Sequence, residues 1–132
     1  MKASVKNERS LTTPEELAEL AALYDTYGNL LKDGQRDIFE AYVLDNLSLS
    51  EIAEEQGMTR QGVYDTINRS RKKLREYEER LGIIERTTAI ERHLDDMEQA
   101  TSSLRSQQTG ESQHEKILTI LDQHIQEIRD LL

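Results

Sequence analysis

Residues 49–67 read LSEIAEEQGMTRQGVYDTI, and the spacing of small and apolar residues in this stretch decides the fold that we expect. Ala53 stands where a larger side chain would collide with a second, crossing helix. Gly57 follows four residues later, at the turn, where a positive φ is needed and glycine has no steric cost. The side chains expected to fill the small core between the two helices are Ile52, Met58, Val63 and Ile67. The stretch therefore predicts a helix-turn-helix, a motif whose second helix enters the major groove of DNA.

Capping signals mark where the two helices of this motif begin and end. Ser48 and Glu51 form a capping box that starts the first helix, which ends at Gly57. Thr59 is expected to cap the second helix. Beyond it, apolar or small residues recur at alternating four-three spacing, which is typical of one long helix. These residues are Val63, Ile67, Ser70, Leu74, Tyr77, Leu81 and Ile84. Gly82 is expected to end or bend this helix.

Two further helices are expected upstream of the motif. Thr13, Pro14 and Glu16 read as an N-cap, a proline at the first helical position and a capping-box acid. The helix that they open is predicted to stop between Gly28 and Gly34. A second helix is predicted over 35–45, with its apolar side formed by Ile38, Phe39, Tyr42 and Val43. Strand-favouring aromatic residues are scarce, which agrees with a helical chain.

The last third of the chain carries two amphipathic stripes. The first continues to about Arg105 through Ile90, Leu94, Met97 and Leu104. Residues 106–113 (SQQTGESQ) lack apolar side chains and read as a linker. The last helix, over 114–132, carries a stripe of Leu118, Leu121, Ile125, Ile128 and Leu132. These helices either fold back as an antiparallel hairpin or pair with another chain, and we expect self-association into a homodimer as well. The predicted fold is all-α, a helix-turn-helix domain followed by long amphipathic C-terminal helices.

Charge is unevenly distributed along the chain. The formal net charge of −9 weakens a simple expectation of nucleic-acid binding, because Lys and Arg supply most of the affinity for phosphates. Residues 60–75 nevertheless carry six basic residues against one acid. The residues expected to face bases are Arg60, Gln61, Tyr64, Asp65, Asn68 and Arg69. Those expected to meet phosphates are Arg71, Lys72, Lys73 and Arg75. The alternative is that these basic side chains only cover the solvated face of a long helix.

Length and composition exclude several protein classes. The 132 residues suffice for one compact domain, or a small domain with a helical appendage. Without cysteine, neither a disulfide framework nor a thiolate metal site is possible. No stretch approaches the roughly 20 apolar residues of a membrane span, and the N-terminus does not read as a signal peptide. We therefore expect a cytoplasmic protein without membrane insertion.

The residues give no indication of catalysis. His93, His114 and His124 lack the HExxH spacing of zinc proteases, and we interpret them as solvent-exposed helix residues. No glycine-rich phosphate loop occurs, and the many carboxylates fit the wet faces of amphipathic helices. We therefore expect no enzyme, with no cofactor, no metal and no small-molecule substrate.

Three blocks of sequence fall in the order and at the spacing of a known family. They are LSLSEIAEE at 47–55, TRQGVYD at 59–65 and YEERLG at 77–82. With these blocks, residues 17–84 resemble the YlxM family of small bacterial proteins, which are similar in turn to region 4 of sigma factors. The resemblance implies a helix-turn-helix domain of the sigma region 4-like, winged-helix-like type over 14–82. The helical tail over 83–132 resembles the family less specifically, and its apolar stripes, not the resemblance, predict that it dimerises or binds a partner. In that family the gene lies beside those of the signal recognition particle GTPase and its receptor, which implies a regulatory part in that pathway.

Several binding hypotheses stay open at this point. We do not expect a complete sigma factor, because the residues before Leu17 are too few to supply its polymerase-binding helices. One hypothesis is a sequence-specific DNA-binding transcriptional regulator. Another is an accessory protein that contacts the signal recognition particle through its RNA or its GTPase, since basic residues on one helix suit either nucleic acid. The third is a purely protein-binding helical module.

Overall fold

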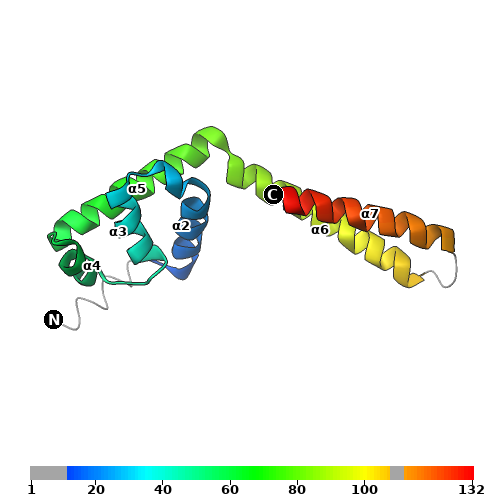
Figure 1. The fold of residues 1–132 in the computed structure, drawn as a ribbon, viewed down its shortest axis with the longest axis horizontal. Coiled ribbons are helices and arrows are strands. Elements are labelled where there is room, and N and C mark those ends of the chain that lie inside the picture. Colours follow the sequence, from blue (N-terminus) through cyan, green and yellow to red (C-terminus); the bar gives the residue numbers. More distant parts are fainter. Residues whose placement is uncertain (1–11, 108–111) are drawn as a thin grey trace. The chain divides into compact units, whose positions relative to one another are not determined.

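Helices are the regular secondary structure of the residues that the structure describes. The computed structural model describes residues 12–107 and 112–132. Its helices follow one another along the chain with short connections (Figure 1). They are α2 (Pro14–Tyr27), a 3-10 turn (Gly28–Leu30), α3 (Asp33–Val43), α4 (Leu49–Gln56), α5 (Arg60–Leu81), α6 (Ile83–Gln107) and α7 (Ser112–Leu131). The prediction of an all-α fold with a helix-turn-helix is confirmed. Among the described residues, no helix combines the length and the apolar character that a membrane span requires.

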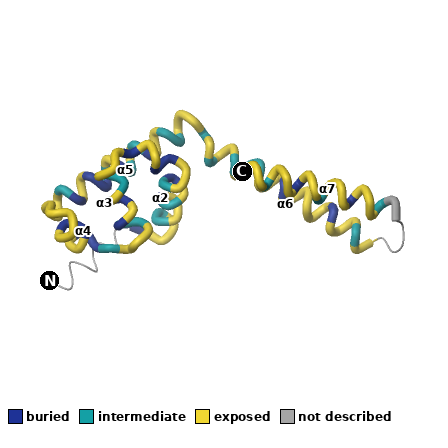
Figure 2. The backbone as a smooth tube through the Cα atoms, in the orientation of Figure 1, coloured by how far each residue is buried: buried dark blue, intermediate teal, exposed yellow. Residues whose placement is uncertain are grey.

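The chain divides into two compact units, residues 1–84 and residues 85–132. We call them the helix-turn-helix unit and the hairpin unit. In the first, α2, α3 and α4 all pack against α5 and enclose a core between them (Figure 2). The fully buried large side chains of this core are Leu20, Tyr27, Phe39, Ile52, Val63 and Leu74.

The capping signals in the sequence act as predicted. The side-chain hydroxyl of Thr13 accepts a hydrogen bond from the Glu16 N–H at 3.1 Å, and that of Ser48 accepts one from the Glu51 N–H at the same distance. Each satisfies a backbone donor that the first turn of the helix leaves without a partner. At the C-terminal end of α5, Gly82 has a φ of 61° and ends the helix in the left-handed conformation.

The helix predicted over 35–45 is displaced toward the N-terminus. α3 begins at Asp33 and ends at Val43. Its early start is favoured by Asp33, because a carboxylate in the first turn interacts well with the positive end of the helix dipole. After its end, Asn46 adopts a left-handed φ of 57°, a conformation that Asn tolerates better than most residues.

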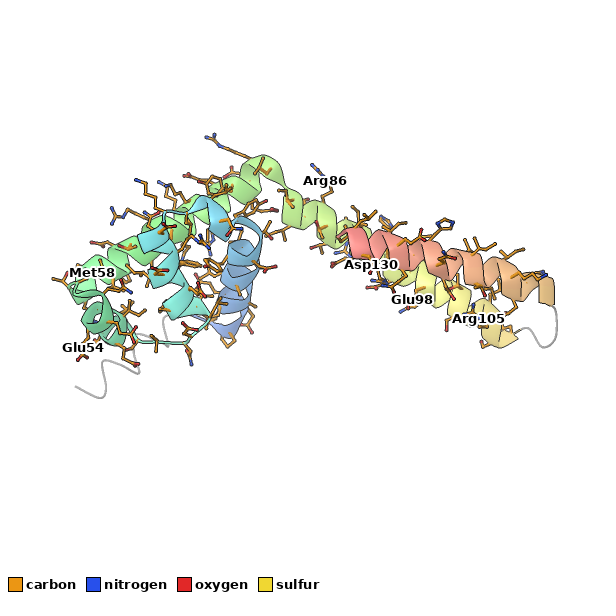
Figure 3. The ribbon with its side chains drawn as sticks, in the orientation of Figure 1. Glu54, Met58, Arg86, Glu98, Arg105 and Asp130 are labelled. Atoms are coloured by element: carbon orange, nitrogen blue, oxygen red, sulfur yellow. The ribbon has the colours of Figure 1, made fainter. Side chains whose placement is uncertain are left out.

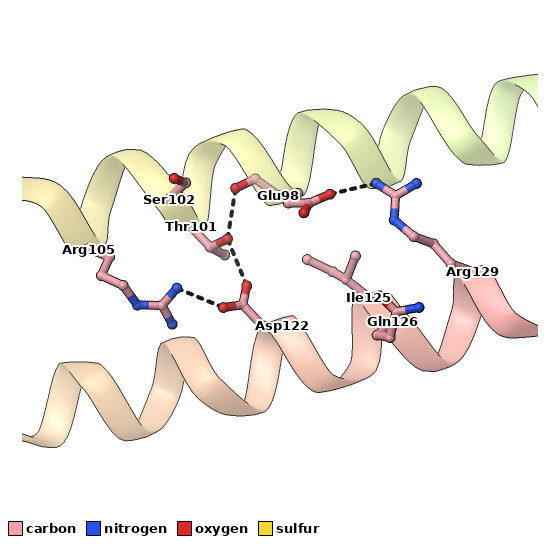
Figure 4. Close-up of a pocket in the computed structure, with 8 residues that line it drawn as sticks. All are labelled: Glu98, Thr101, Ser102, Arg105, Asp122, Ile125, Gln126 and Arg129. Carbon is pink, nitrogen blue, oxygen red and sulfur yellow. Dashed lines mark hydrogen bonds and ion pairs between the residues drawn. The ribbon is translucent and has the colours of Figure 1, made fainter.

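The hairpin unit consists of α6 and α7, which run antiparallel and lie side by side (Figures 1 and 4). Leu94, Leu118 and Ile125 are at most 3% exposed and form the row of contacts between the helices, which we call the seam. The predicted linker over 106–113 is too long, because α6 continues through Gln107 and α7 begins at Ser112. Polar residues can continue a helix at its ends, where their side chains face solvent. The polar composition of this stretch therefore predicted a connection longer than the one observed. The remaining four positions of that prediction lie outside the described residues.

Candidate nucleic-acid interface

A tight turn joins α4 to α5. Gly57 has a φ of 64°, and the N–H of Met58 donates to the carbonyl oxygen of Ala53 at 2.9 Å. Thr59 caps α5 by accepting a hydrogen bond from the Gly62 N–H at 3.0 Å. Ile52 of α4 and Val63 of α5 are fully buried, and Ile67 of α5 is 3% exposed. The helices therefore cross around the small core that the sequence predicts.

Met58 departs from that prediction. We expected it in the core between the helices, but it is 38% exposed and projects from the turn (Figure 3). The left-handed residue before it reverses the chain direction, and the side chain that follows then points away from α4. The core closes without Met58, because Ile52 and Val63 already occupy the space between the helices.

The first turns of α5 have one buried and one open face. The buried face consists of Val63, Thr66, Ile67, Ser70 and Leu74. The residues that are exposed on the other side are Arg60, Gln61, Tyr64, Asp65 and Arg69. Five of the six positions expected to face bases therefore lie open to solvent, in the half of the helix next to the turn.

Three of these side chains interact along the helix surface. Gln61 donates from Nε2 to the Asp65 Oδ1 at 3.0 Å, and an Arg69 guanidinium nitrogen lies 3.5 Å from the Thr66 hydroxyl. The Asp65 carboxylate thus holds the Gln61 amide against the helix. Asp65 also adds a negative charge to the open face, where it repels phosphate but can accept a hydrogen bond from a cytosine amino group.

Asn68, the sixth position, is half-buried and borders a cavity of about 200 Å³. The cavity lies beside the open face, between α5 and the residues Tyr42 and Leu49. The hydroxyl groups of Tyr42 and Thr12, which also border it, are 2.6 Å apart. The sequence placed Tyr42 on the apolar side of its helix, and it does pack against the core, but its position at this surface was not predicted. The available signal was its hydroxyl group, because a tyrosine at the end of an apolar stripe needs a polar partner or solvent.

The basic residues expected to meet phosphates divide into two pairs. Arg71 and Arg75 turn toward α2, where both form ion pairs with Glu16, at 3.1 and 3.5 Å, and Arg75 also pairs with Glu19 at 3.3 Å. Lys72 is exposed and Lys73 half-buried, and neither makes an ion pair within the described part of the chain. The structure therefore brings Lys72 and Lys73, with Arg69, to the accessible surface and engages Arg71 and Arg75 in packing α5 onto α2.

The N-terminus of α5 differs from those of the other α-helices. Each of the other described α-helices carries an acidic residue in its first turn, whereas α5 has none and begins with Arg60. The partial positive charge at a helix N-terminus favours anions. At α5 no carboxylate of its own first turn offsets that charge, so the end nearest the turn suits a phosphate.

The histidines and carboxylates of the described residues were the remaining candidates for a metal site. Within these residues, no group of three His, Asp or Glu side chains is placed to hold a metal ion. His93 and His124 are exposed, as expected, while His114 is half-buried against its neighbours. The expectation that all three histidines are exposed is therefore wrong for His114.

Comparison with known proteins supports the resemblance noted in the sequence. The sequence profile of UPF0122, the YlxM / p13-like helix-turn-helix proteins, matches residues 15–127. A UPF0122 protein of Thermoanaerobacter sp. (strain X514) is 39% identical over 112 residues, which are 85% of this chain and 92% of the relative. A UPF0122 protein of Symbiobacterium thermophilum is 40% identical over 86 residues, which are 65% of this chain and 80% of that protein. One from Bacillus cereus (strain AH187) is 44% identical over 72 residues, which are 54% and 66% of the two chains.

The match extends from the beginning of α2 into α7 and includes the whole turn between α4 and α5. The family is described by a helix-turn-helix, a motif that serves nucleic-acid binding, and not by an enzymatic activity. The chain belongs to the UPF0122 family of YlxM / p13-like helix-turn-helix proteins.

Proposed function

We propose that this protein is a regulator that binds a nucleic-acid duplex through the first half of α5. The observation that carries the proposal is the open face next to the turn, where Arg60, Gln61 and Tyr64 are exposed together. The lack of an acidic residue in the first turn of α5 supports it, because an anion there meets no nearby carboxylate of that turn.

The residues of this surface have different proposed roles. Arg60 and Arg69 are suited to guanine, and Gln61 and Asn68 to adenine, because their donors and acceptors match those base edges. Tyr64 adds an exposed ring beside them. Lys72 and Lys73 supply contacts to phosphates, which hold the helix in place without reading sequence. Arg71 and Arg75 position α5 on α2, and they reach phosphates only when their ion pairs with Glu16 and Glu19 exchange.

We further propose the signal recognition particle as the first setting in which to test this binding. The YlxM resemblance implies that pathway, and an RNA hairpin offers the phosphates that Lys72 and Lys73 require. RNA duplexes are recognised mainly by shape and backbone, because their major groove is too narrow for side chains. A DNA-binding regulator is the alternative, and it requires base contacts from Arg60 and Gln61 in a major groove.

Both nucleic acids can be compared in one binding experiment. Fluorescence anisotropy of a labelled DNA duplex and of the particle RNA hairpin, each over a salt series, measures affinity and the number of phosphate contacts. The variant R60A/N68A/R69A is expected to bind the preferred nucleic acid at least about tenfold more weakly. On DNA, each lost base contact costs about 1–3 kcal/mol, and on RNA the two lost arginines weaken the attraction to phosphates.

A matched variant separates this surface from a general effect of charge. R80A/R86A also removes two positive charges, but both residues are exposed and lie outside the first half of α5. We expect it to bind as the wild type does. Equal losses in the two variants, with helix content unchanged, would show that α5 does not form the contact surface.

A further inference from the structure

The hairpin unit has two unlike faces, one on each side of the seam. On one face, ion pairs and hydrogen bonds connect α6 to α7 (Figure 4). Arg105 lies 2.8 Å from Asp122, which also accepts a hydrogen bond from Thr101 at 3.0 Å. Arg129 lies 2.8 Å from Glu98. This polar face surrounds a cavity of about 300 Å³ and satisfies its charges within the hairpin.

The other face carries a second apolar row on each helix. In α7, Ile117, Leu121 and Ile128 recur at intervals of four and seven residues, which keep side chains on one side of a helix. They are 50%, 39% and 40% exposed, whereas Leu118 and Ile125 of the seam are nearly inaccessible. In α6, Met97 and Leu104 are seven residues apart and are 46% and 43% exposed.

The rows of the two helices lie on the same side of the hairpin. Met97 is two residues from Asp95 of the polar face, and Ile128 is two residues from Gln126, which borders the polar cavity. A step of two residues turns about 200° around a helix, so each row lies away from the polar face of its own helix. We call the combined surface the apolar face. It consists of Met97, Leu104, Ile117, Ile120, Leu121, Ile128 and Leu131.

The size of the apolar face is that of an interface. Its exposed apolar area is on the order of 600 Å², at the upper limit of the largest patch on a typical monomer. A standard interface buries about 800 Å² on each partner. Helices with two apolar rows are typical of four-helix bundles, where each helix packs against two neighbours. The hairpin supplies only one neighbour for each of its helices.

The charges at the rim of this face favour a second copy of the same chain. Arg92, Asp96, Lys116 and Glu127 are all exposed, and each is two residues from a buried residue of the seam. A step of two residues turns about 200° around a helix, so these four side chains lie on the outer sides of the hairpin, beside the apolar face. A rim with equal numbers of both signs can complement itself, whereas a strongly charged partner would need a rim of one sign. We propose that two chains pair through their apolar faces and form a four-helix bundle from their two hairpins.

Sedimentation of the full chain without nucleic acid tests this proposal independently of the proposed function. The wild type is expected to sediment with twice the mass of one chain at tens of micromolar, and L121K/I128K with the mass of one. The matched control, T119K/Q123K, adds the same charge to the solvent-exposed polar side of α7 and is expected to remain a dimer. A wild type that stays monomeric at hundreds of micromolar overturns the proposal and leaves the face to a partner of another kind.

Cysteine cross-linking decides the question if the lysine variant fails to fold. The natural chain has no cysteine, so a single introduced thiol reports on one position. Leu121→Cys is expected to give a cross-linked dimer with a short bismaleimide, and Gln123→Cys is expected to give almost none at the same concentration. Equal cross-linking at the two positions contradicts pairing through the apolar face.

Discussion

The two units of this protein bury their apolar residues in different ways. Four helices of the helix-turn-helix unit enclose side chains such as Phe39 and Leu74, which no solvent reaches. The two helices of the hairpin unit meet along one seam, and large side chains such as Ile117 and Leu131 remain exposed. A helix can shield one stripe against one neighbour. A core shared by several helices therefore closes on itself, while a two-helix hairpin leaves any second stripe uncovered.

The distribution of aromatic residues allows the two units to be observed separately. All five tyrosines and the single phenylalanine lie before residue 84. Near-ultraviolet circular dichroism and tyrosine fluorescence thus report on the helix-turn-helix unit, whereas far-ultraviolet dichroism reports on the helices of both units.

The largest effect is expected from Phe39→Ala in the enclosed core. Phe39 is fully buried, and its ring stacks on that of Tyr24 with centroids 5.7 Å apart. Removing it should lower the free energy of unfolding of the helix-turn-helix unit by about 3–5 kcal/mol, because the surrounding helices cannot collapse into the space. Urea titration followed by tyrosine fluorescence measures the loss.

Ile125→Ala is the matched substitution in the seam. It should weaken the hairpin and leave the tyrosine transition where it is in the wild type. If either variant shifts both signals equally, the two units unfold as one, and the contrast between them does not extend to stability.

A smaller effect is expected from Gly57→Ala at the turn. No heavy atom lies within 4 Å of the position that its Cβ would take, so the cost comes from the positive φ alone. For residues other than Gly, Asn and Asp, this left-handed conformation costs roughly 1–2 kcal/mol. Thermal unfolding followed by near-ultraviolet dichroism measures the shift. Gly57→Asn should lose less, as Asn46 already adopts such a conformation in this chain, and equal losses would point to a steric cause.

The smallest effect concerns the exposed ion pairs of the hairpin. The Arg105 guanidinium, aided by the Thr101 hydroxyl, holds the pKa of Asp122 below its usual value of 3.8. A lowered pKa in the folded state means stability that is present above pH 3.8 and is lost as the pH falls toward the lowered value. Far-ultraviolet dichroism should show the hairpin weakening in that range, and Asp122→Asn should reduce this dependence. An unchanged acid profile in the variant would assign the weakening to other carboxylates.

Local features of the sequence predicted most of the backbone. Thr13, Ser48 and Gly82 mark helix ends through hydrogen bonds and φ angles that involve only a few neighbouring residues. The candidate base-reading residues were predicted from helical periodicity, because Val63 and Ile67 identify the buried face and so its opposite. The predictions failed where a local pattern was compatible with two environments, as at Met58 and in the polar residues around Gln107.

By itself, the sequence determined the order of the helices, the turn at Gly57 and the position of the basic stretch, because each depends on residues within a few turns of one another. The tertiary structure alone decided which positive charges are available. Arg75 and Glu19 are separated by 56 residues, and only the packing of α2 on α5 brings them together. Packing likewise decided which of the two apolar rows in α7 became the seam, since both have the same spacing and only the position of α6 distinguishes them.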